Sequence, residues 1–151
     1  MEPESRNIYK TARAVAGLTQ ERWAEAVGCS VDSVRNYESG TQTPSDEIVR
    51  AMSEISGLAP LAYWHLCRKS TLAEDMLPKV DKLPLPQAVV QLLVAVSDFS
   101  ADHGALLRIA ADGTIDFEER RAWDKIAAEL DEIVKAALQV KFSEGGDGNG
   151  P

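Results

Sequence analysis

The chain has 151 residues, of which 44% are hydrophobic and 26% charged, and its formal net charge is −8. This composition is typical of a folded protein with one or two small domains. No apolar run approaches the ~20 residues that a membrane-spanning helix needs, and the acidic, polar start MEPESRN is unlike a secretory signal. We therefore expect a cytoplasmic protein.

Signatures of catalysis and of metal binding are missing from the sequence. Cys29 and Cys67 lie far apart and neither belongs to a CxxC pair, so the favoured interpretation is two half-buried thiols. Neither His65 nor His103 stands at a ligand spacing from these cysteines. There is no GxSxG, phosphate-binding loop, HExxH or GxGxxG motif. We expect no enzyme activity, no cofactor and no bound metal.

The first predicted helix covers Ser5 to Ala16. Its apolar residues are Ile8, Tyr9, Ala12, Val15 and Ala16. They recur at helical spacing, and Gly17 follows as the end signal.

Two short helices joined by a glycine turn are predicted within Thr19–Gly40. Thr19 suits the N-cap of the first helix, and Gly28 ends it because glycine enters the left-handed conformation without strain. Ser30 is the next N-cap, and Gly40 closes the second helix, which starts at Val31. This arrangement is a helix-turn-helix.

The spacing within this stretch meets four requirements of that motif. Counted from Gln20, the small residue at the fifth place is Ala24, and the turn glycine at the ninth is Gly28. The aliphatic residue at the fifteenth place is Val34, and the aromatic residue at the eighteenth is Tyr37. The alternative is an ordinary helical hairpin with a glycine turn.

Two further helices complete the predicted N-terminal domain, residues 1–69. The fourth helix starts at Pro44 and Ser45 and runs to Gly57, and its buried face holds Ile48, Val49, Met52 and Ile55. The fifth starts at Pro60 and carries Leu61, Tyr63, Trp64, Leu66 and Cys67. Core packing is the favoured role of this aromatic helix, and a dimer contact is the alternative.

A Leu/Pro-rich connection is predicted for residues 70–86, because Pro78, Pro84 and Pro86 interrupt any helix there. Residues 87–142 are predicted to form an antiparallel helical hairpin for oligomerisation or partner binding. The tail, residues 143–151, is predicted to be disordered because it cannot bury anything.

Two apolar stripes at alternating spacings of three and four predict the hairpin. The first stripe comprises Val89, Leu92, Val96, Phe99, His103, Leu106 and Ala110, with Gly104 as the expected break. The second comprises Trp123, Ile126, Leu130, Ile133, Ala137 and Val140, with acidic residues that include Glu129 on the opposite face. His103 is interpreted as a core or interface residue.

The loop Ala111–Glu119, ADGTIDFEE, has part of a calcium-loop pattern. In that register Arg108 and Ala110 would occupy ligand positions, and neither can bind a hard cation. We expect instead a turn at Asp112–Gly113 and an N-cap at Asp116.

Residues 5–57 resemble the Cro/CI-type (XRE-like) helix-turn-helix DNA-binding domains of phage repressors. The resemblance rests on AGLTQ (16–20), WAEAVGCS (23–30), YESG (37–40) and TPS (43–45). It implies an all-α fold with a lambda-repressor-like bundle of five helices, which the predicted hairpin follows. It also implies that the helix from Val31 enters the major groove of DNA.

The same resemblance implies roles for individual residues. DNA contacts would come from Gln20, Ser30, Val31, Asp32, Ser33, Arg35, Asn36, Thr41, Gln42 and Thr43. Structural roles would fall to Arg13, Ala24, Gly28, Val34, Tyr37 and Glu38, with Arg13 and Glu38 forming a partly buried salt bridge. Asn36 suits adenine and Val31 a thymine methyl group. Asp32 can accept from cytosine or favour the helix N-terminus.

The whole chain is also similar to phage-associated regulatory protein CII-like transcription factors, through LAYWHL, LPLPQAVVQLL and DGTIDFEER. The implied function is a dimeric, sequence-specific regulator of prophage or mobile-element genes. Its acidity argues for dimerisation, because phosphate neutralisation supplies most non-specific affinity for DNA. The alternative is a protein-interaction module, antitoxin-like or polymerase-contacting, that binds a basic partner through the acidic hairpin.

Overall fold

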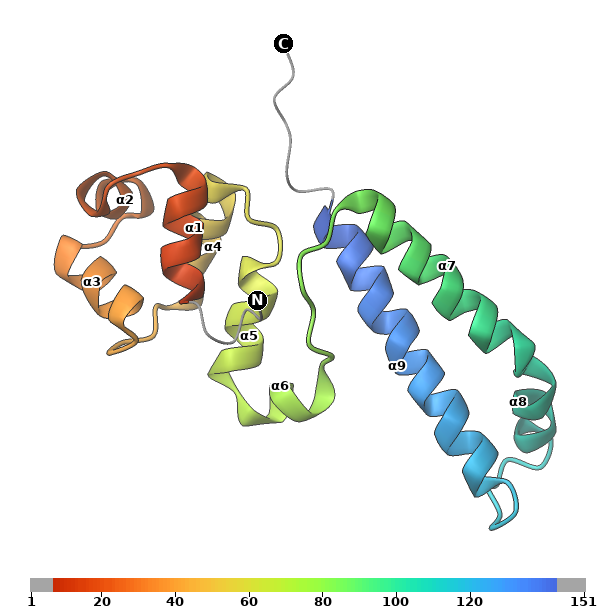
Figure 1. Cartoon of the computed structure of the whole chain (residues 1–151). Helices are drawn as coiled ribbons and strands as arrows, with labels where there is room; N and C mark the ends of the chain where they lie inside the picture. The colour runs from red at the N-terminus through yellow and green to blue at the C-terminus, as the bar shows by residue number, and fades with distance from the viewer. Residues whose placement is uncertain (1–6, 144–151) are drawn as a thin grey trace. The chain divides into compact units, whose positions relative to one another are not determined.

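The computed structural model describes residues 7–143, which form nine helices and no strand (Figure 1). Two compact units divide between Lys82 and Leu83. The first contains α1 Ile8–Ala16, α2 Gln20–Val27, α3 Val31–Ser39, α4 Asp46–Ser56, α5 Leu61–Lys69 and α6 Thr71–Met76. The second contains α7 Leu85–Ala101, α8 His103–Ala110 and α9 Arg120–Ser143. The predicted fold class, an all-α bundle followed by a helical hairpin, is confirmed.

Side-chain caps fix the starts of the first four helices. The Asn7 carboxamide oxygen accepts from the backbone N–H of Tyr9 and Lys10, at 3.0 Å each. Thr19, Ser30 and Ser45 cap α2, α3 and α4 in the same manner. These side chains satisfy backbone donors that have no partner inside a helix, so each boundary is set locally by the sequence.

Five helices share the core of the first unit. Its buried residues are Ile8, Tyr9, Ala12, Trp23, Ala24, Val27, Val34, Val49, Met52, Leu58 and Leu61. Trp23 is 0% exposed, and its indole N–H has no hydrogen-bond partner among residues 7–143. The large ring therefore fills the space between helices at the cost of one unsatisfied donor.

A buried polar chain joins α5 to α1 and α4. The Tyr9 hydroxyl lies 2.9 Å from Nδ1 of the buried His65, whose Nε2 lies 3.1 Å from an Asp46 carboxylate oxygen. Lys69 donates to the same oxygen at 2.6 Å. The Lys69 ammonium and His65 hold the pKa of Asp46 below its ordinary value. Polar contacts as well as apolar ones thus hold α5 on the bundle.

The connection predicted for residues 70–86 is more regular than expected. It contains α6, and α7 already begins at Leu85. Between them, the Tyr63 hydroxyl donates to the Pro78 carbonyl at 2.5 Å, and the Trp64 indole N–H donates to the Val80 carbonyl at 2.7 Å. The segment after α6 is therefore part of the first unit.

In the second unit, α7 and α9 lie side by side and run in opposite directions (Figure 1). The fully buried residues of this unit are Ala88, Ile109, Ile126, Ala136 and Gln139. On α7 the residues turned inward are Ala88, Leu92, Ala95 and Phe99. The predicted first stripe is therefore wrong at alternate positions: Val89, Val96, His103 and Ala110 are exposed. Nδ1 of His103 lies 2.7 Å from the Ser100 carbonyl oxygen.

The second stripe and the expected helix break also need correction. The second predicted stripe is wrong at Leu130, which is exposed, whereas Glu129 is largely buried and not on the outer face. The break falls at Asp102, which pairs with Lys125, and Gly104 lies inside α8. The break between α7 and α8 therefore lies at a residue that forms an ion pair with α9, and not at the glycine.

The predicted turn and cap before α9 are present. The Asp112 carboxylate accepts from the Thr114 N–H, and Gly113 has a positive φ of 73°. Asp116 and Glu119 cap each other's backbone N–H, which is a capping box. The predicted disordered tail lies outside the described residues, apart from Ser143 at the end of α9. Within residues 7–143, no helix is long and apolar enough to cross a membrane.

Candidate functional site

The candidate site is built on the turn between α2 and α3. Gly28 has a φ of 80°, and a Cβ placed on it would meet nothing within 4 Å, so backbone conformation and not space favours glycine there. Ala24 and Val34 are buried where α2 and α3 meet, and Tyr37 packs partly against the core. These residues fix the angle at which α3 is presented.

A charged clamp holds the C-terminal half of α3. Glu38 accepts from Arg13 at 2.5 and 3.0 Å and from the Gln20 side chain at 2.8 Å. Arg13 also donates to the Leu18 carbonyl at 3.0 Å. Burial by itself would raise the pKa of Glu38, but the hydrogen bonds from Arg13 and Gln20 outweigh it and lower that pKa. The clamp therefore contains an ionised carboxylate at neutral pH.

The exposed face of α3 carries the side chains that the sequence nominates for base contacts. Asp32 and Arg35 are exposed, and Ser33 and Asn36 are half-buried. Ser30 lies exposed at the N-cap. Residues 32, 36 and 39 share one side of the helix because they follow one another at intervals of four and three. Ser39 is thus a further exposed member of this face that the sequence reasoning did not include, although its spacing from Asn36 indicates it.

These polar side chains bond mainly to one another. Arg35 donates to Asp32 at 3.0 Å, and the Ser30 and Ser33 hydroxyls lie 2.8 Å apart. Asn36 donates weakly to Gln42 at 3.4 Å. The pairing partly neutralises Asp32, the carboxylate least suited to a phosphate surface. Because all these bonds are exposed, a ligand can replace them at little cost.

Four nominated residues lie apart from this face or have other partners. Val31 packs partly against the core, so only part of its side chain is accessible to a base. Gln20 is half-buried and bonded to Glu38, which gives it a bracing contact. Thr41 and Thr43 are exposed in the loop after α3, where the Thr41 and Ser39 hydroxyls lie 2.7 Å apart.

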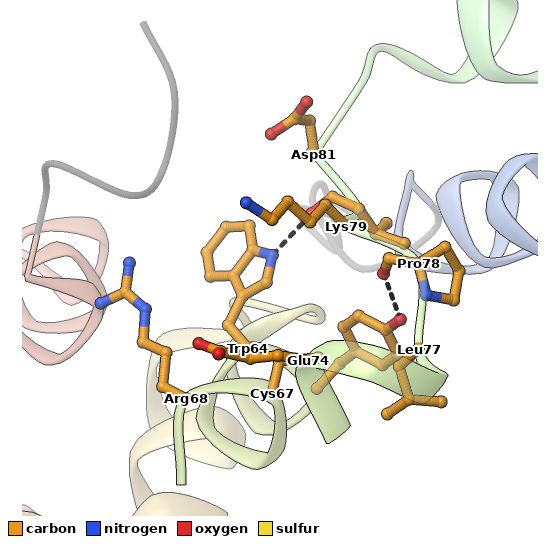
Figure 2. A pocket seen from close by; sticks show the side chains of 10 residues that line it. Trp64, Cys67, Arg68, Glu74, Leu77, Pro78, Lys79 and Asp81 are labelled. Atoms are coloured by element: carbon orange, nitrogen blue, oxygen red, sulfur yellow. Dashed lines mark hydrogen bonds between the residues drawn. The ribbon is translucent and has the colours of Figure 1, made fainter. Parts of the chain in front are cut away.

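Figure 2 shows a separate hollow of about 380 Å³ beside α5 and α6. Its lining includes Trp64, Cys67, Leu77 and Pro78, and charged side chains stand at its rim. Burial raises the pKa of the Cys67 thiol, and burial beside Cys67 raises the pKa of Tyr63 to about 12. A thiol with a raised pKa is a poor nucleophile, so the hollow has no reactive group of that kind.

No group of three or more His, Cys, Asp or Glu residues able to hold a metal ion occurs within the described range, 7–143. Burial also raises the pKa of the Cys29 thiol. The face of α3 therefore stands out chemically as a set of neutral and charged hydrogen-bonding groups on a rigid, exposed helix.

Comparison with known proteins agrees with this geometry. Residues 10–62 match the family model described as a helix-turn-helix domain. They form a helix-turn-helix domain. The matched region contains most of α1, all of α2 to α4 and the start of α5, and domains of this kind support a DNA-binding function. No curated protein and no solved structure gave a match to the chain.

Proposed function

We propose that the chain is a sequence-specific, DNA-binding transcriptional regulator of prophage or mobile-element genes that acts as a dimer. The observation that carries this proposal is the exposed polar face of α3 in a helix-turn-helix held rigid by the Arg13–Glu38–Gln20 clamp. An α-helix of this kind fits the major groove, where side-chain amides, hydroxyls and guanidinium groups discriminate between base pairs.

Base reading is assigned to Asn36, Ser33 and Arg35. Asn36 can make a bidentate contact with adenine, and Arg35 can turn from Asp32 to a guanine or a phosphate. Asp32, freed from Arg35, can accept from a cytosine amino group. Contacts with the sugar-phosphate backbone of the DNA come from residues that flank the helix, namely Ser30, Thr41, Gln42 and Thr43.

A dimer follows from the charge. With a net charge of −8, a single domain cannot obtain much affinity from phosphate neutralisation. Two domains on two half-sites about one helical turn apart double the specific contacts without requiring a basic surface. Either the hairpin or α5 supplies the pairing surface under this proposal.

The test is selection of binding sites from random double-stranded DNA, followed by titration of the selected site. Asn36→Ala with Ser33→Ala should weaken binding to that site by at least about tenfold, since each well-placed base contact is worth roughly 1–3 kcal/mol. Gln87→Ala with Gln91→Ala, which changes two exposed neutral side chains of α7, is the matched control and should bind as the wild type does. If the Asn36/Ser33 variant bound the selected site as tightly as the control variant does, the assignment of base reading to this face of α3 would be wrong.

A second function, a protein-interaction module, is favoured by one observation. Phe117 is 96% exposed in the loop before α9, between the acidic residues Asp116 and Glu118. An exposed aromatic side chain among carboxylates suits a basic partner with an apolar pocket, such as a toxin or a polymerase subunit. A stoichiometric basic protein that co-purifies with the wild type but not with Phe117→Ser, together with no DNA selected, would favour this function.

A further inference from the structure

The hairpin exposes an apolar surface that is unusual in so charged a chain. Helix α7 has 17 residues and a single charged side chain, Asp98. Only Ala88 of this helix is fully buried. Most of its large aliphatic side chains are therefore exposed, although 26% of the whole chain is charged.

We call this surface the apolar flank. It comprises Leu85, Val89, Val90, Leu93 and Val96 of α7 together with Leu130 and Val134 of α9, all between 37% and 64% exposed.

Residues of both helices stand on the same side of the hairpin. On α7 the inward positions are Ala88, Leu92, Ala95 and Phe99, and on α9 they include Ile126, Glu129, Ile133 and Ala136. Val89 and Val96 directly follow inward positions on α7, and Leu130 directly follows one on α9. The inward positions of each helix are separated by alternating intervals of three and four residues. In an antiparallel pair of helices, the residue that directly follows the second position of a three-residue interval lies on the same flank in both helices. Leu93 lies one turn from both Val89 and Val96, and Val134 lies one turn after Leu130, so the residues of the apolar flank form one continuous surface.

The opposite flank is mostly polar, and Val94 is its exposed aliphatic residue on α7. It carries Gln91 and Asp98 from α7 and Lys125 and Glu132 from α9, which occupy the positions just before inward residues. The charged side chains of Asp98, Glu132 and Lys125 favour contact of that flank with water, whereas none of the residues that make up the apolar flank is charged. The hairpin is therefore amphipathic as a pair of helices and not only helix by helix.

We infer that the apolar flank is the surface through which two copies of this chain associate, their hairpins packing face to face as a four-helix bundle. The inference rests on the dimer in the proposed function and names the surface that forms it. Two hairpins that each lack a second layer complete a bundle when the apolar sides meet.

The size of the surface suits a second copy. Its seven half-exposed aliphatic side chains present on the order of 500 Å², in the range of the largest patch on a monomer. A stable interface buries about 800 Å² per partner, so the polar residues around the flank would contribute the remainder. Large apolar patches of this kind mark association surfaces.

The charge also selects a second copy over a different partner. A two-fold contact places each surface against a copy of itself, so any charge near the axis meets a like charge. In a chain with a net charge of −8, an uncharged surface is the one that can meet itself without repulsion. A basic partner would instead match an acidic surface, and the apolar flank has no carboxylate.

The experiment is analytical ultracentrifugation of the full chain over a concentration series. The wild type should sediment as a dimer. Leu93→Glu with Val134→Glu should raise the dimer dissociation constant by at least about 30-fold, the effect of losing one hot-spot residue. Both side chains are about half exposed or more in one chain, so circular dichroism should show unchanged helix content.

The matched control adds the same two charges to other exposed positions. Gln87→Glu with Gln91→Glu should leave the dimer intact, which separates burial at the apolar flank from the general effect of more negative charge. The neutral variant Leu93→Asn with Val134→Asn should weaken the dimer as well. A wild type that is monomeric throughout the series, or a Glu variant as dimeric as the wild type, would overturn the inference.

DNA selection with the same proteins keeps this inference separate from the proposed function. If the wild type is a dimer that selects no DNA, the proposed regulatory function is wrong and the apolar flank still stands as a pairing surface. If the wild type is a monomer that selects a single half-site, the pairing surface is wrong and DNA binding still stands. The combination expected is a wild type that selects paired half-sites and a Glu variant that selects single ones with lower affinity.

Discussion

The two helical units of this chain bury different kinds of side chain, although the described residues of both form helices and loops without a strand. The helix-turn-helix unit encloses a tryptophan, a methionine and several large aliphatic residues between five helices. The hairpin fully buries two isoleucines, two alanines and a glutamine, and it leaves most large aliphatic residues of α7 exposed. Five helices can surround a side chain, whereas two antiparallel helices have only one line of contact. The first unit therefore encloses its own core, whereas the second leaves the apolar flank exposed.

The largest effect is expected from truncating the central residue of the first core. Trp23→Ala should lower the free energy of unfolding of that unit by about 3–5 kcal/mol, because it leaves a cavity among five helices. Ile126→Ala, at the best-buried isoleucine of the hairpin, should cost nearer ~2 kcal/mol, since two helices can close over a smaller gap. Urea unfolding and amide hydrogen exchange of the full chain measure both. Equal losses of unfolding free energy for Trp23→Ala and Ile126→Ala would contradict the proposed difference between the two cores.

A smaller effect, about 2 kcal/mol at neutral pH, is expected for Glu38→Gln, which removes the charge from a largely buried clamp. The lowered pKa of Glu38 means that its carboxylate stabilises the fold above the ordinary value of 4.5. That stabilisation is lost as pH falls below 4.5 through the folded pKa. The difference between wild type and variant in urea midpoint should therefore narrow on acidification.

The control for this titration is Glu25→Gln. Glu25 pairs with Arg22 at 3.4 Å on the surface, with both side chains 74% exposed. A pair of this kind contributes little, so the urea midpoint should hardly change at any pH. A constant gap between Glu38→Gln and wild type across the acid range would show that the clamp acts through shape and not through charge.

An effect of about 1 kcal/mol is expected for Gly28→Ala, because alanine at a φ of 80° is strained although the space is open. Gly104→Ala is the comparison in the hairpin. Gly104 lies inside α8, where alanine is the better helix former, so this change should stabilise the protein slightly. Thermal unfolding measures the two shifts, and the same sign at both glycines would contradict the distinction.

The smallest effect is expected for Leu107→Ala in α8. Leu107 is 67% exposed and lies outside the apolar flank, so the free energy of unfolding should change by less than about 0.5 kcal/mol. Chemical denaturation at several protein concentrations is the measurement. A larger loss that grows with concentration would extend the pairing surface onto α8.

Much of the helix-turn-helix could be predicted because its determinants are local. Thr19, Ser30 and Gly28 each act on a backbone conformation within a few residues, and the structure has them as caps and turn. The hairpin stripes were predicted less well. Leu92, Phe99 and Leu106 are compatible with two alternative inward stripes at spacings of three and four. Valines complete one of these stripes, and alanines complete the other. The structure turns the small alanines inward, because two helices pack closely only over small side chains.

The sequence by itself determined the helical class, the caps, the glycine turn and the candidate reading face of α3, because spacing and capping act at short range. Only the tertiary structure showed that the partner of Gln20 on α3 is Glu38, that His103 is exposed and that Glu129 is largely buried. It also decided that the valines of α7 face outward. Each of these depends on which side of a helix meets its neighbour, and periodicity leaves that choice open by one residue.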